Sequence, residues 1–317
     1  MDQLTNLLTL EDNLPHSDLR GVIAAAATPV TADFSIDVDR LAAHCARLLA
    51  DGCAFVSSFG TTGEGASFST AEKIAALRAL KAAGASMAHQ IPSIMTPSTD
   101  EAGGMLAEIA ALGCRAALVL PPFYYPVTEE GIVAFFALML ERAGNPDIEL
   151  LLYNIPQLSR TAFTPSLIDK LVARFGSRIV GLKDSTGDVE NGVMLARRYP
   201  GLSIFTGDDR VVPALLAAGG AGMIGGMPNV FARDLRALYD APEGPAGAAL
   251  LANQAARIDT VNANGSQLAL KAALAEVYAD PEWARAMPPL VALGETEARG
   301  VWDAFLATGF VYGDAAA

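Results

Sequence analysis

The sequence predicts an α/β fold, a TIM (β/α)8 barrel with a C-terminal helical appendage. Short apolar runs alternate with helical patterns about eight times, as the strands and helices of such a barrel do. The alternation extends from residue 21 to about residue 240, close to the ~250 residues typical of this fold. An open doubly wound sheet has the same local pattern, but no GxGxxG motif or phosphate-binding loop follows the first strand.

The predicted strands are short segments with a nearly continuous apolar character. Parallel strands that are covered on both faces are expected to have this character. In chain order the strands are residues 22–28, 54–59, 92–95, 116–120, 150–153, 179–182, 203–206 and 223–225.

Three segments between the strands carry clear helix signals. Each follows a capping Ser or Thr and is followed directly by a glycine, the usual boundaries of a helix. The predicted caps are Ser69-Thr70, Thr99 and Thr164-Pro165. The predicted helices are residues 71–83, 100–112 and 166–175.

Changes in composition divide the chain into three parts. Residues 1–20 form an N-terminal extension, residues 21–240 the catalytic barrel and residues 241–317 a C-terminal helical region. The last part is rich in alanine and is interrupted at residues 242–247 and at Pro288-Pro289, where proline and glycine end helices. We expect it to pack on the barrel as a small helical unit.

Charge and hydropathy exclude several classes of partner. The 317 residues carry a formal net charge of −13, which argues against nucleic acid and against an anionic membrane surface, because both require basic patches. The N-terminus is acidic and lacks the apolar core of a signal peptide, and no apolar run is long enough to cross a membrane. We therefore expect a soluble cytoplasmic protein.

The cysteines and histidines do not have the spacing of metal ligands. A catalytic zinc ion usually takes several closely spaced ligands of these types. We expect reduced cysteines in the core, histidines in ordinary surface or core positions, and no metal site. The residues concerned are Cys45, Cys53, Cys114, His16, His44 and His89.

Reactive side chains stand at the ends of five predicted strands. In a TIM barrel the catalytic residues occupy these carboxyl ends. The segments are GTTGE at 60–64, PPFYY at 121–125, YNIP at 153–156, GLKDS at 181–185 and GDDR at 207–210.

Lys183 is the most informative residue among them. It closes the apolar run 179–182, so its side chain starts inside the mouth of the barrel. A lysine that is partly removed from water prefers its charged form less strongly, and a neutral amine can attack a carbonyl to form a Schiff base. The alternative is a lysine that extends to solvent or pairs with a carboxylate.

Two further features suit Schiff-base chemistry. Imine formation requires protons to be moved on and off the intermediate, and the hydroxyl of Tyr153 is the natural candidate for this transfer. The GTTGE loop offers backbone N–H groups and two hydroxyls, which can hold a carboxylate. Alternatively, Tyr153 is an interior aromatic residue and the loop is an ordinary glycine-rich turn.

Taken together, the motifs GTTGE, PPFYYP, YNIP and GLKDS resemble those of the dihydrodipicolinate synthase / N-acetylneuraminate lyase family. The resemblance extends from Gly21, in the segment GVIAAAATPV, to about Leu238, and the helical tail is compatible with it. It implies a homotetramer built as a dimer of dimers. It also implies Schiff-base chemistry on pyruvate or another 2-keto acid without a metal or an organic cofactor.

The resemblance further implies a role for each motif residue. Lys183 would form the Schiff base, Tyr153 would transfer protons, and Thr61 would join Tyr153 in a hydroxyl relay. Thr62, together with the backbone of the loop that contains Gly63, would hold the substrate carboxylate.

Tyr124, the first tyrosine of FYY, matches the tyrosine that in many members of this family reaches into the site of a neighbouring subunit. The resemblance therefore implies that each active site needs residues from two chains.

The branches of this family differ in the residues that bind the distal end of the substrate. In the synthase branch an arginine two residues after the proline of YNxP binds a substrate carboxylate. Here Leu158 occupies that position, and Arg160, two residues further on, is a candidate to bind the carboxylate in its place. This spacing is more similar to that of the sugar-acid lyases.

In the sialic acid lyase branch, residues after the seventh strand bind sugar hydroxyls. Asp209 matches one of them and Ser185 retains a hydroxyl, whereas Arg210 replaces an acidic residue and Gly226 replaces a hydroxyl. We therefore expect a shorter or more acidic substrate, with Arg210 binding a distal anion or remaining a solvated arginine.

The leading hypothesis is a lyase that acts on pyruvate or a 2-keto-3-deoxy sugar acid through an imine of Lys183, by cleavage, dehydration or deamination. The main competing hypothesis is 4-hydroxy-tetrahydrodipicolinate synthase, which condenses pyruvate with aspartate semialdehyde. A non-catalytic keto-acid-binding protein and a phosphate-binding barrel that uses Gly225-Gly226 also agree with parts of the sequence.

Overall fold

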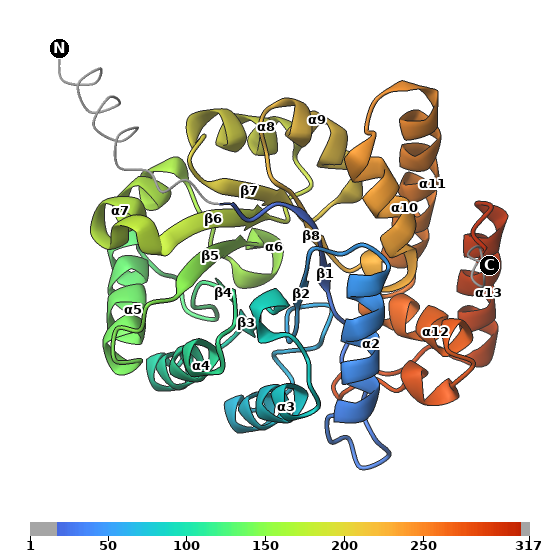
Figure 1. The fold of residues 1–317 in the computed structure, drawn as a ribbon, viewed down its shortest axis with the longest axis horizontal. Coiled ribbons are helices and arrows are strands. Elements are labelled where there is room, and N and C mark those ends of the chain that lie inside the picture. Colours follow the sequence, from blue (N-terminus) through green and yellow to red (C-terminus); the bar gives the residue numbers. More distant parts are fainter. Residues whose placement is uncertain (1–17, 312–317) are drawn as a thin grey trace.

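A computed structural model describes residues 18–311. It contains eight parallel strands surrounded by helices, which confirms the predicted TIM barrel (Figure 1). Most of the predicted N-terminal extension, the last six residues of the helical region and His16 lie outside the described residues. The strands are β1 Gly21–Ala25, β2 Phe55–Ser57, β3 Ser93–Ile94, β4 Ala116–Val119, β5 Glu149–Asn154, β6 Ile179–Asp184, β7 Ser203–Thr206 and β8 Gly222–Gly225.

The strands follow the order β2-β1-β8-β7-β6-β5-β4-β3. Because β2 and β3 are the two edges of this order, their contact closes the barrel. A parallel bridge joins Val56 to Gln90, and backbone hydrogen bonds run from Ile91 N to Val56 O (2.8 Å) and from Ser93 N to Ser58 O (2.9 Å). These contacts cover the edges of β2 and β3, which would otherwise be open to other chains.

Strands β1 to β6 end one to three residues from their predicted ends, whereas β7 and β8 end as predicted. The differences in β1 and β6 concern the mouth of the barrel. β1 ends at Ala25 rather than at residue 28 because Ala27 N bonds to the side chain of Asn229 (2.9 Å) instead of to a strand. β6 continues beyond Leu182 through Asp184 because its backbone pairs with β5 on one side and β7 on the other. Lys183 therefore lies within a strand that has a neighbour on each side.

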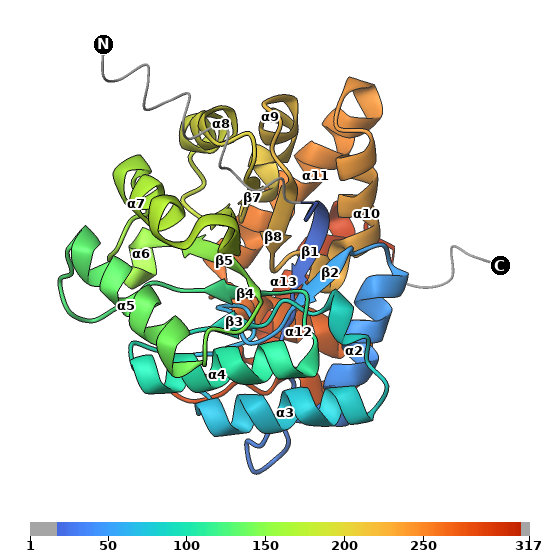
Figure 2. The same cartoon turned by 60° about the vertical axis from the view of Figure 1, so that its left-hand side comes forward.

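The helices cover the outside of the barrel, and Figure 2 shows them as a ring around the strands. Helical turns also occur at Met87–His89, Gly176–Arg178, Asp209–Val211 and Pro281–Ala284. The helices are α2 Val38–Ala50, α3 Thr70–Ala82, α4 Thr99–Leu112, α5 Glu129–Arg142, α6 Pro156–Ser159, α7 Pro165–Phe175, α8 Val189–Arg198, α9 Val212–Ala217, α10 Pro228–Asp240, α11 Gly244–Ala263, α12 Gln267–Val277 and α13 Glu295–Ala307.

The predicted caps hold in two of the three helices. Ser69 caps α3 in a reciprocal arrangement with Glu72, and Thr164 caps α7. For α4 the prediction of Thr99 was wrong. The cap is Ser98, which has an extended backbone and accepts a hydrogen bond from Glu101 N, whereas Thr99 is already helical.

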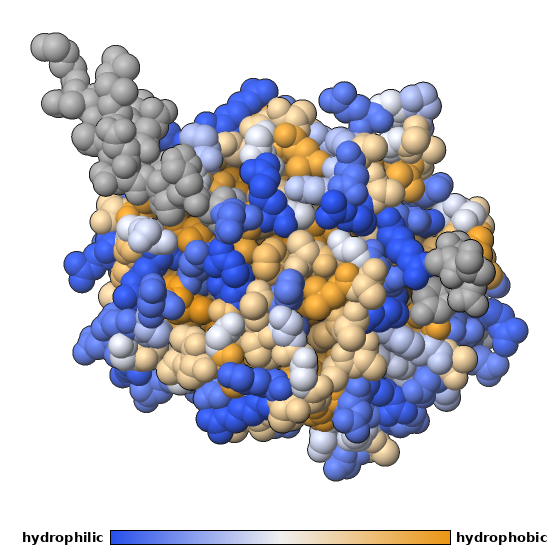
Figure 3. Space-filling view, in the orientation of Figure 1, coloured by the Kyte–Doolittle hydropathy of each residue, from blue (hydrophilic) through white to orange (hydrophobic). Residues whose placement is uncertain are grey.

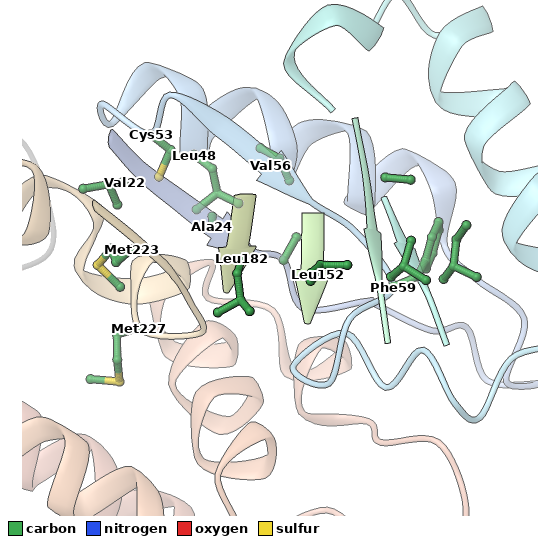
Figure 4. Packing of buried hydrophobic residues seen from close by; sticks show 14 of the residues in the cluster. Val22, Ala24, Leu48, Cys53, Val56, Phe59, Leu152, Leu182, Met223 and Met227 are labelled. Atoms are coloured by element: carbon green, nitrogen blue, oxygen red, sulfur yellow. The ribbon is translucent and has the colours of Figure 1, made fainter. Parts of the chain in front are cut away.

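The core consists of two layers separated by the sheet. Side chains that point outward from the strands pack against the helices, and Figure 4 shows Leu152 and Leu182 in this layer with Val22 and Val56. Alternate residues point inward and fill the barrel, among them Leu151, Tyr153, Val180 and Phe205. In β5 this alternation sends Tyr153 into the barrel. In β6 it is interrupted by a register shift, which pairs Leu150 with Ile179 but Leu151 with Gly181. Val180 and Lys183 therefore both point inward, and Leu182 points outward.

The cysteines lie where the sequence predicts them. Cys45, Cys53 and Cys114 are buried and free. Burial raises the pKa of each thiol to about 12, so these groups are unreactive thiols at neutral pH.

The helices after the barrel gather on one side of it, next to α10 and α2 (Figure 1). The interruption predicted near Pro242 separates α10 from α11, with a proline in the first turn of α11. Pro288-Pro289 lies in the segment between α12 and α13 and has a cis peptide bond. This tail packs on α10 and also reaches the mouth of the barrel.

On the face seen in Figure 3, hydrophilic residues are scattered among apolar ones. Among residues 18–311, no helix combines the length and the apolar character that crossing a membrane needs.

Candidate active site

Lys183 and Tyr153 are neighbours across the β5–β6 ladder, where the register pairs Tyr153 directly with Lys183. The lysine is 5% exposed. Its Nζ atom lies 4.1 Å from the centroid of the Tyr153 ring, which is a cation–π distance. Among residues 18–311 no carboxylate forms an ion pair with Lys183. The predicted alternative of a lysine paired with a carboxylate therefore does not apply to the described chain.

Thr61 connects the loop after β2 to this pair. A hydrogen bond of 3.0 Å joins its hydroxyl to that of Tyr153. The amine, the phenol and the threonine hydroxyl, which come from three separate segments, thus meet at the carboxyl end of the barrel. This is the arrangement that a proton relay beside a nucleophilic amine requires.

The remaining polar residues of YNIP and GLKDS hold the two strand ends together. Asn154 Nδ2 donates to Asp184 Oδ1 (2.9 Å), and Asn154 Oδ1 accepts from Phe163 N (3.0 Å). Asp184 also accepts from Thr186 and from Asn191 Nδ2 (2.8 Å). Because both side chains are buried, these bonds fix the strand residues that directly follow Tyr153 and Lys183.

A cavity of about 650 Å³ opens above these residues. It is lined by strand-end residues and by residues of α11 and α12. Predicted site residues on its wall are Thr61, Thr62, Tyr153, Lys183, Ser185, Asp209, Arg210 and Gly226. Residues on this wall that were not predicted include Gln157, Asn262, Ser266 and Gln267. Asp208 is also on it and lies in the GDDR segment, without a predicted role of its own.

The residues that were not predicted come from two parts of the chain, the segment beside the YNIP motif and the helical tail. Gln157 adjoins the YNIP motif and donates to Ser185 O (2.7 Å), so its place beside a predicted strand end was a usable signal. Asn262, Ser266 and Gln267 belong to the helical tail, more than seventy residues after Lys183. No local pattern of the tail indicates that it reaches the cavity.

Gly63 is not on the wall of the cavity. Its carbonyl accepts from Thr28 Oγ1 (2.8 Å), and a Cβ atom at this position would lie 2.6 Å from Ala26 O. The glycine at position 63 is needed because the loop packs directly on the end of β1.

Gly226, a residue predicted to lie next to the substrate, lines the cavity. A Cβ atom there would lie 2.8 Å from Thr62 Oγ1, so this glycine leaves space for Thr62.

Asp209 is fully buried, and neither of its carboxylate oxygens has a hydrogen-bond partner among the described residues. Burial, with the nearby Asp208 charge, raises the pKa of Asp209 to about 8. The carboxyl group is therefore mainly protonated at neutral pH and can both donate and accept a hydrogen bond. A substrate hydroxyl is a suitable partner for such a group.

Neither candidate arginine offers an unpaired guanidinium to the cavity in this conformation. Arg210 lines the cavity, but its guanidinium pairs with Asp208 (2.6 Å) and with Asp259 (3.1 Å). Arg160 is exposed, has a left-handed backbone (φ 57°) at the end of α6, and does not line the cavity. Leu158, at the position of the synthase arginine, does line it.

Tyr124 lies outside the cavity of its own chain. Its side chain is 82% exposed and forms an edge contact with the ring of Tyr125, with the ring centroids 5.1 Å apart. A second cavity of about 370 Å³ adjoins the first through Thr61, Ile155 and Leu158, and Phe123 is on its wall.

Residues 18–311 contain no group of three or more His, Cys, Asp or Glu side chains that could hold a metal ion. His44 is buried between Tyr278 Oη and Asn229 Oδ1, each 2.7 Å from a ring nitrogen. Burial, with the charge of Arg47, lowers its pKa to about 3. His44 is thus a neutral core residue, as its isolated position in the sequence indicates.

A parallel barrel with a buried lysine and a tyrosine on the wall of its carboxyl-end cavity defines a class of barrel enzymes that act on small molecules. Comparisons with known proteins identify the family. The sequence model of the Dihydrodipicolinate synthetase family matches residues 18–304, and the chain belongs to this family.

Relatives agree with this assignment. The chain is 40% identical over 275 residues to an uncharacterized DapA-like lyase of Chloroflexus aurantiacus, covering 86% of this chain and 91% of the relative. It is 32% identical over 230 residues to 4-hydroxy-tetrahydrodipicolinate synthase 2 of Streptomyces coelicolor, covering 72% and 74% of the two chains. The crystal structure of dihydrodipicolinate synthase from Agrobacterium tumefaciens superposes with a TM-score of 0.85 at 29% identity, covering 91% of this chain and 99% of the other.

The family is one of lyases of the class I aldolase type, which needs no metal ion, and this chain is such a lyase. The family resemblance expected from GTTGE, PPFYYP, YNIP and GLKDS is thus confirmed over nearly the whole chain.

Proposed function

We propose that Lys183 forms a Schiff base with pyruvate or with the keto group of a 2-keto-3-deoxy sugar acid. The observation that carries this proposal is the position of the Lys183 amine, which is buried on the cavity wall, free of carboxylate partners among the described residues, and 4.1 Å from the ring of Tyr153. A buried amine without a counter-charge is well placed to react as a nucleophile.

In the proposed reaction the neutral amine adds to the keto carbon, and the carbinolamine loses water to give the imine. The Tyr153 hydroxyl, bonded to Thr61, moves the protons that these steps need. When the substrate hydroxyl at carbon 4 loses its proton, the bond between carbons 3 and 4 breaks and its electron pair moves into the imine as an enamine. Release of the aldehyde, protonation of carbon 3 and hydrolysis of the imine give pyruvate and regenerate Lys183.

The other side chains on the cavity wall support a hydroxylated substrate. Asp209, Ser185 and Gln157 are polar groups of the cavity at the side of β6 and β7, and Thr62 offers a hydroxyl on the loop after β2. Arg210 is already held by Asp208 and Asp259, so a distal carboxylate would have to compete for it. We therefore favour a sugar acid with hydroxyls over a diacid.

A second candidate is 4-hydroxy-tetrahydrodipicolinate synthase activity, favoured by the 32% identity to the Streptomyces coelicolor enzyme of that name. Leu158 on the cavity wall argues against it, because a leucine cannot pair with the carboxylate of aspartate semialdehyde. Comparing turnover of pyruvate plus aspartate semialdehyde with turnover of sugar acids decides between the two. Faster condensation with the semialdehyde would reverse our preference.

Assembly and location are further parts of this proposal. The exposed Tyr124 and Tyr125 support a homotetramer, a dimer of dimers, in which Tyr124 reaches the site of a neighbouring chain. Three buried free cysteines support a reducing, cytoplasmic location.

The experiment that tests the Schiff base is trapping with borohydride. The protein is incubated with pyruvate, reduced, and measured by intact mass and peptide mapping, and we expect one adduct on Lys183. The Lys183→Ala variant should give none, whereas the Lys170→Ala variant, which removes an exposed lysine paired with Glu129 and Glu130, should react like the native chain. An adduct at another lysine, or none with a folded protein, would refute the proposal.

A further inference from the structure

The loop that carries Thr61 and Thr62 is tied to the helical tail by a buried ion pair. Glu64, the last residue of GTTGE, pairs through Oε1 with Lys271 Nζ of α12, and both side chains are 0% exposed. Glu64 Oε2 also accepts from Met287 N (2.6 Å), and Lys271 Nζ donates to Arg285 O (2.7 Å). One pair therefore connects the loop to two segments of the tail.

The loop requires such support because its backbone is not relaxed. Glu64 has a left-handed backbone with φ 54°, a conformation that strains a non-glycine residue and persists only where the surroundings hold it. The neighbours of Glu64 are held from the barrel side: Thr28 Oγ1 donates to Gly63 O (2.8 Å), and the buried Lys73 donates to Gly65 O (3.0 Å). Glu64 itself is held from the tail.

A buried ion pair is weak evidence for stability, since desolvation offsets much of the attraction between the charges. What the ion pair contributes is a defined geometry, because each buried charge is stable only with its partner at one position. Here the partner of Glu64 lies one helical turn after Gln267 and directly after Leu270, both of which line the site cavity. The pair thus sets the position of α12 and of the loop relative to the same cavity.

We propose that Glu64 and Lys271 are positioning residues, whose ion pair holds Thr61 and Thr62 in place to bind the carboxylate of the keto acid. This inference rests on the proposed function, in which the loop binds that carboxylate. The helical tail would then do more than line the cavity, because it would also hold the loop that binds the carboxylate.

The decisive variant is the double replacement Glu64→Gln with Lys271→Met, which removes the ion pair without leaving an isolated buried charge. Pyruvate and its neutral analogue pyruvamide are each titrated in the borohydride assay, and the half-saturating concentrations are compared. We expect the value for pyruvate to rise at least about tenfold, the effect of one hydrogen bond to a charged group, with the trapping rate at saturation preserved. The value for pyruvamide should change much less, because it lacks the charge that the loop binds.

A matched control is Arg257→Met, which removes another buried cation of the tail. Arg257 pairs with Asp234 (2.6 Å) and bonds to Thr308, and neither residue belongs to the loop. This variant should lose stability but keep the ratio of the two half-saturating concentrations. If the double variant folds and also keeps the native ratio, the pair is structural only and the inference is wrong.

A measurement on the native protein covers the case in which the variants do not fold. Hydrogen exchange is followed with and without pyruvate in peptides from the loop, from α12 and around Met287. Coupling through the pair predicts slower exchange in all three regions when pyruvate binds. Protection of the loop alone would overturn the inference. A native chain that forms no adduct would instead refute the proposed function itself.

Discussion

Asp209 illustrates how far the chemistry of one residue depends on its surroundings. Its place after β7 marks it as a hydroxyl-binding candidate, but the sequence contains nothing that predicts a carboxyl group with a pKa of about 8. That value arises because the side chain is wholly buried without a hydrogen-bond partner among the described residues. Lys183 differs, because its position at the end of an apolar run already places the start of its side chain inside the mouth of the barrel.

The raised pKa of Asp209 predicts a pH-dependent stability. The folded carboxyl keeps its proton up to pH ~8, whereas the unfolded one loses it near pH 4, so stability decreases as the pH rises from about 4 to above 8. At full ionisation the cost is on the order of 5 kcal/mol. The Asp209→Asn variant should remove this cost and be more stable than the native chain at pH 9 but not at pH 4.

Urea unfolding of the substrate-free protein between pH 4 and 9 measures this effect. Asp303→Asn, at an exposed position of α13, is the control and should leave the pH profile unchanged. Equal pH slopes for the native chain and the Asp209→Asn variant would show that the carboxyl is ionised in the folded state.

At the scale of elements, local sequence signals and tertiary pairing each decide different boundaries. The cap of α3 is readable because Ser69 and Glu72 stand three residues apart before an apolar helical pattern, and the two side chains form the expected reciprocal bonds. The end of β6 is not readable, because Lys183 and Asp184 are polar. They belong to the strand only because β5 and β7 offer hydrogen-bonding partners.

The cap of α3 provides a stability prediction. Ser69→Ala removes the side-chain acceptor for Glu72 N (3.2 Å) and should lower the free energy of unfolding by about 1 kcal/mol. Thermal or urea unfolding measures it. Thr70→Ala, one position further and already helical, is the matched control and should change stability by less than about 0.5 kcal/mol. Equal effects at both positions would mean that the cap contributes nothing specific.

The whole molecule decides which residues form the site. The barrel brings Thr61, Tyr153 and Lys183 together through strand register, but the tail adds Asn262, Ser266 and Gln267 to the cavity wall. In the proposed assembly the exposed Tyr124 completes the site of a second chain, so the site also depends on quaternary structure. The site would then draw on the barrel, the tail and a neighbouring subunit.

Co-expression of two inactive variants tests the shared site. Lys183→Ala and Tyr124→Phe chains should each have little activity, whereas a hybrid dimer regains one intact site. Random pairing makes half of the dimers hybrids, each with one of two sites restored, so about a quarter of native activity is expected for a two-fold symmetric pair. Tyr125→Phe, at the adjacent exposed tyrosine, is the control and should remain active by itself. Activity no higher than that of the separate variants would exclude a shared site.

By itself the sequence determined the barrel and the family, because buried parallel strands leave near-continuous apolar runs and because reactive residues of a barrel follow those runs directly in the chain. For the same reason it indicated Lys183 as the candidate nucleophile. It did not determine that Gly63 packs under the loop, that Arg210 is held by Asp208 and Asp259, or that Lys271 reaches Glu64. These relations join residues between two and more than two hundred positions apart, and they depend on side-chain directions, burial and desolvation. Only the tertiary structure decides these contacts, because they depend on the space around each residue, even where the two partners are close in the chain.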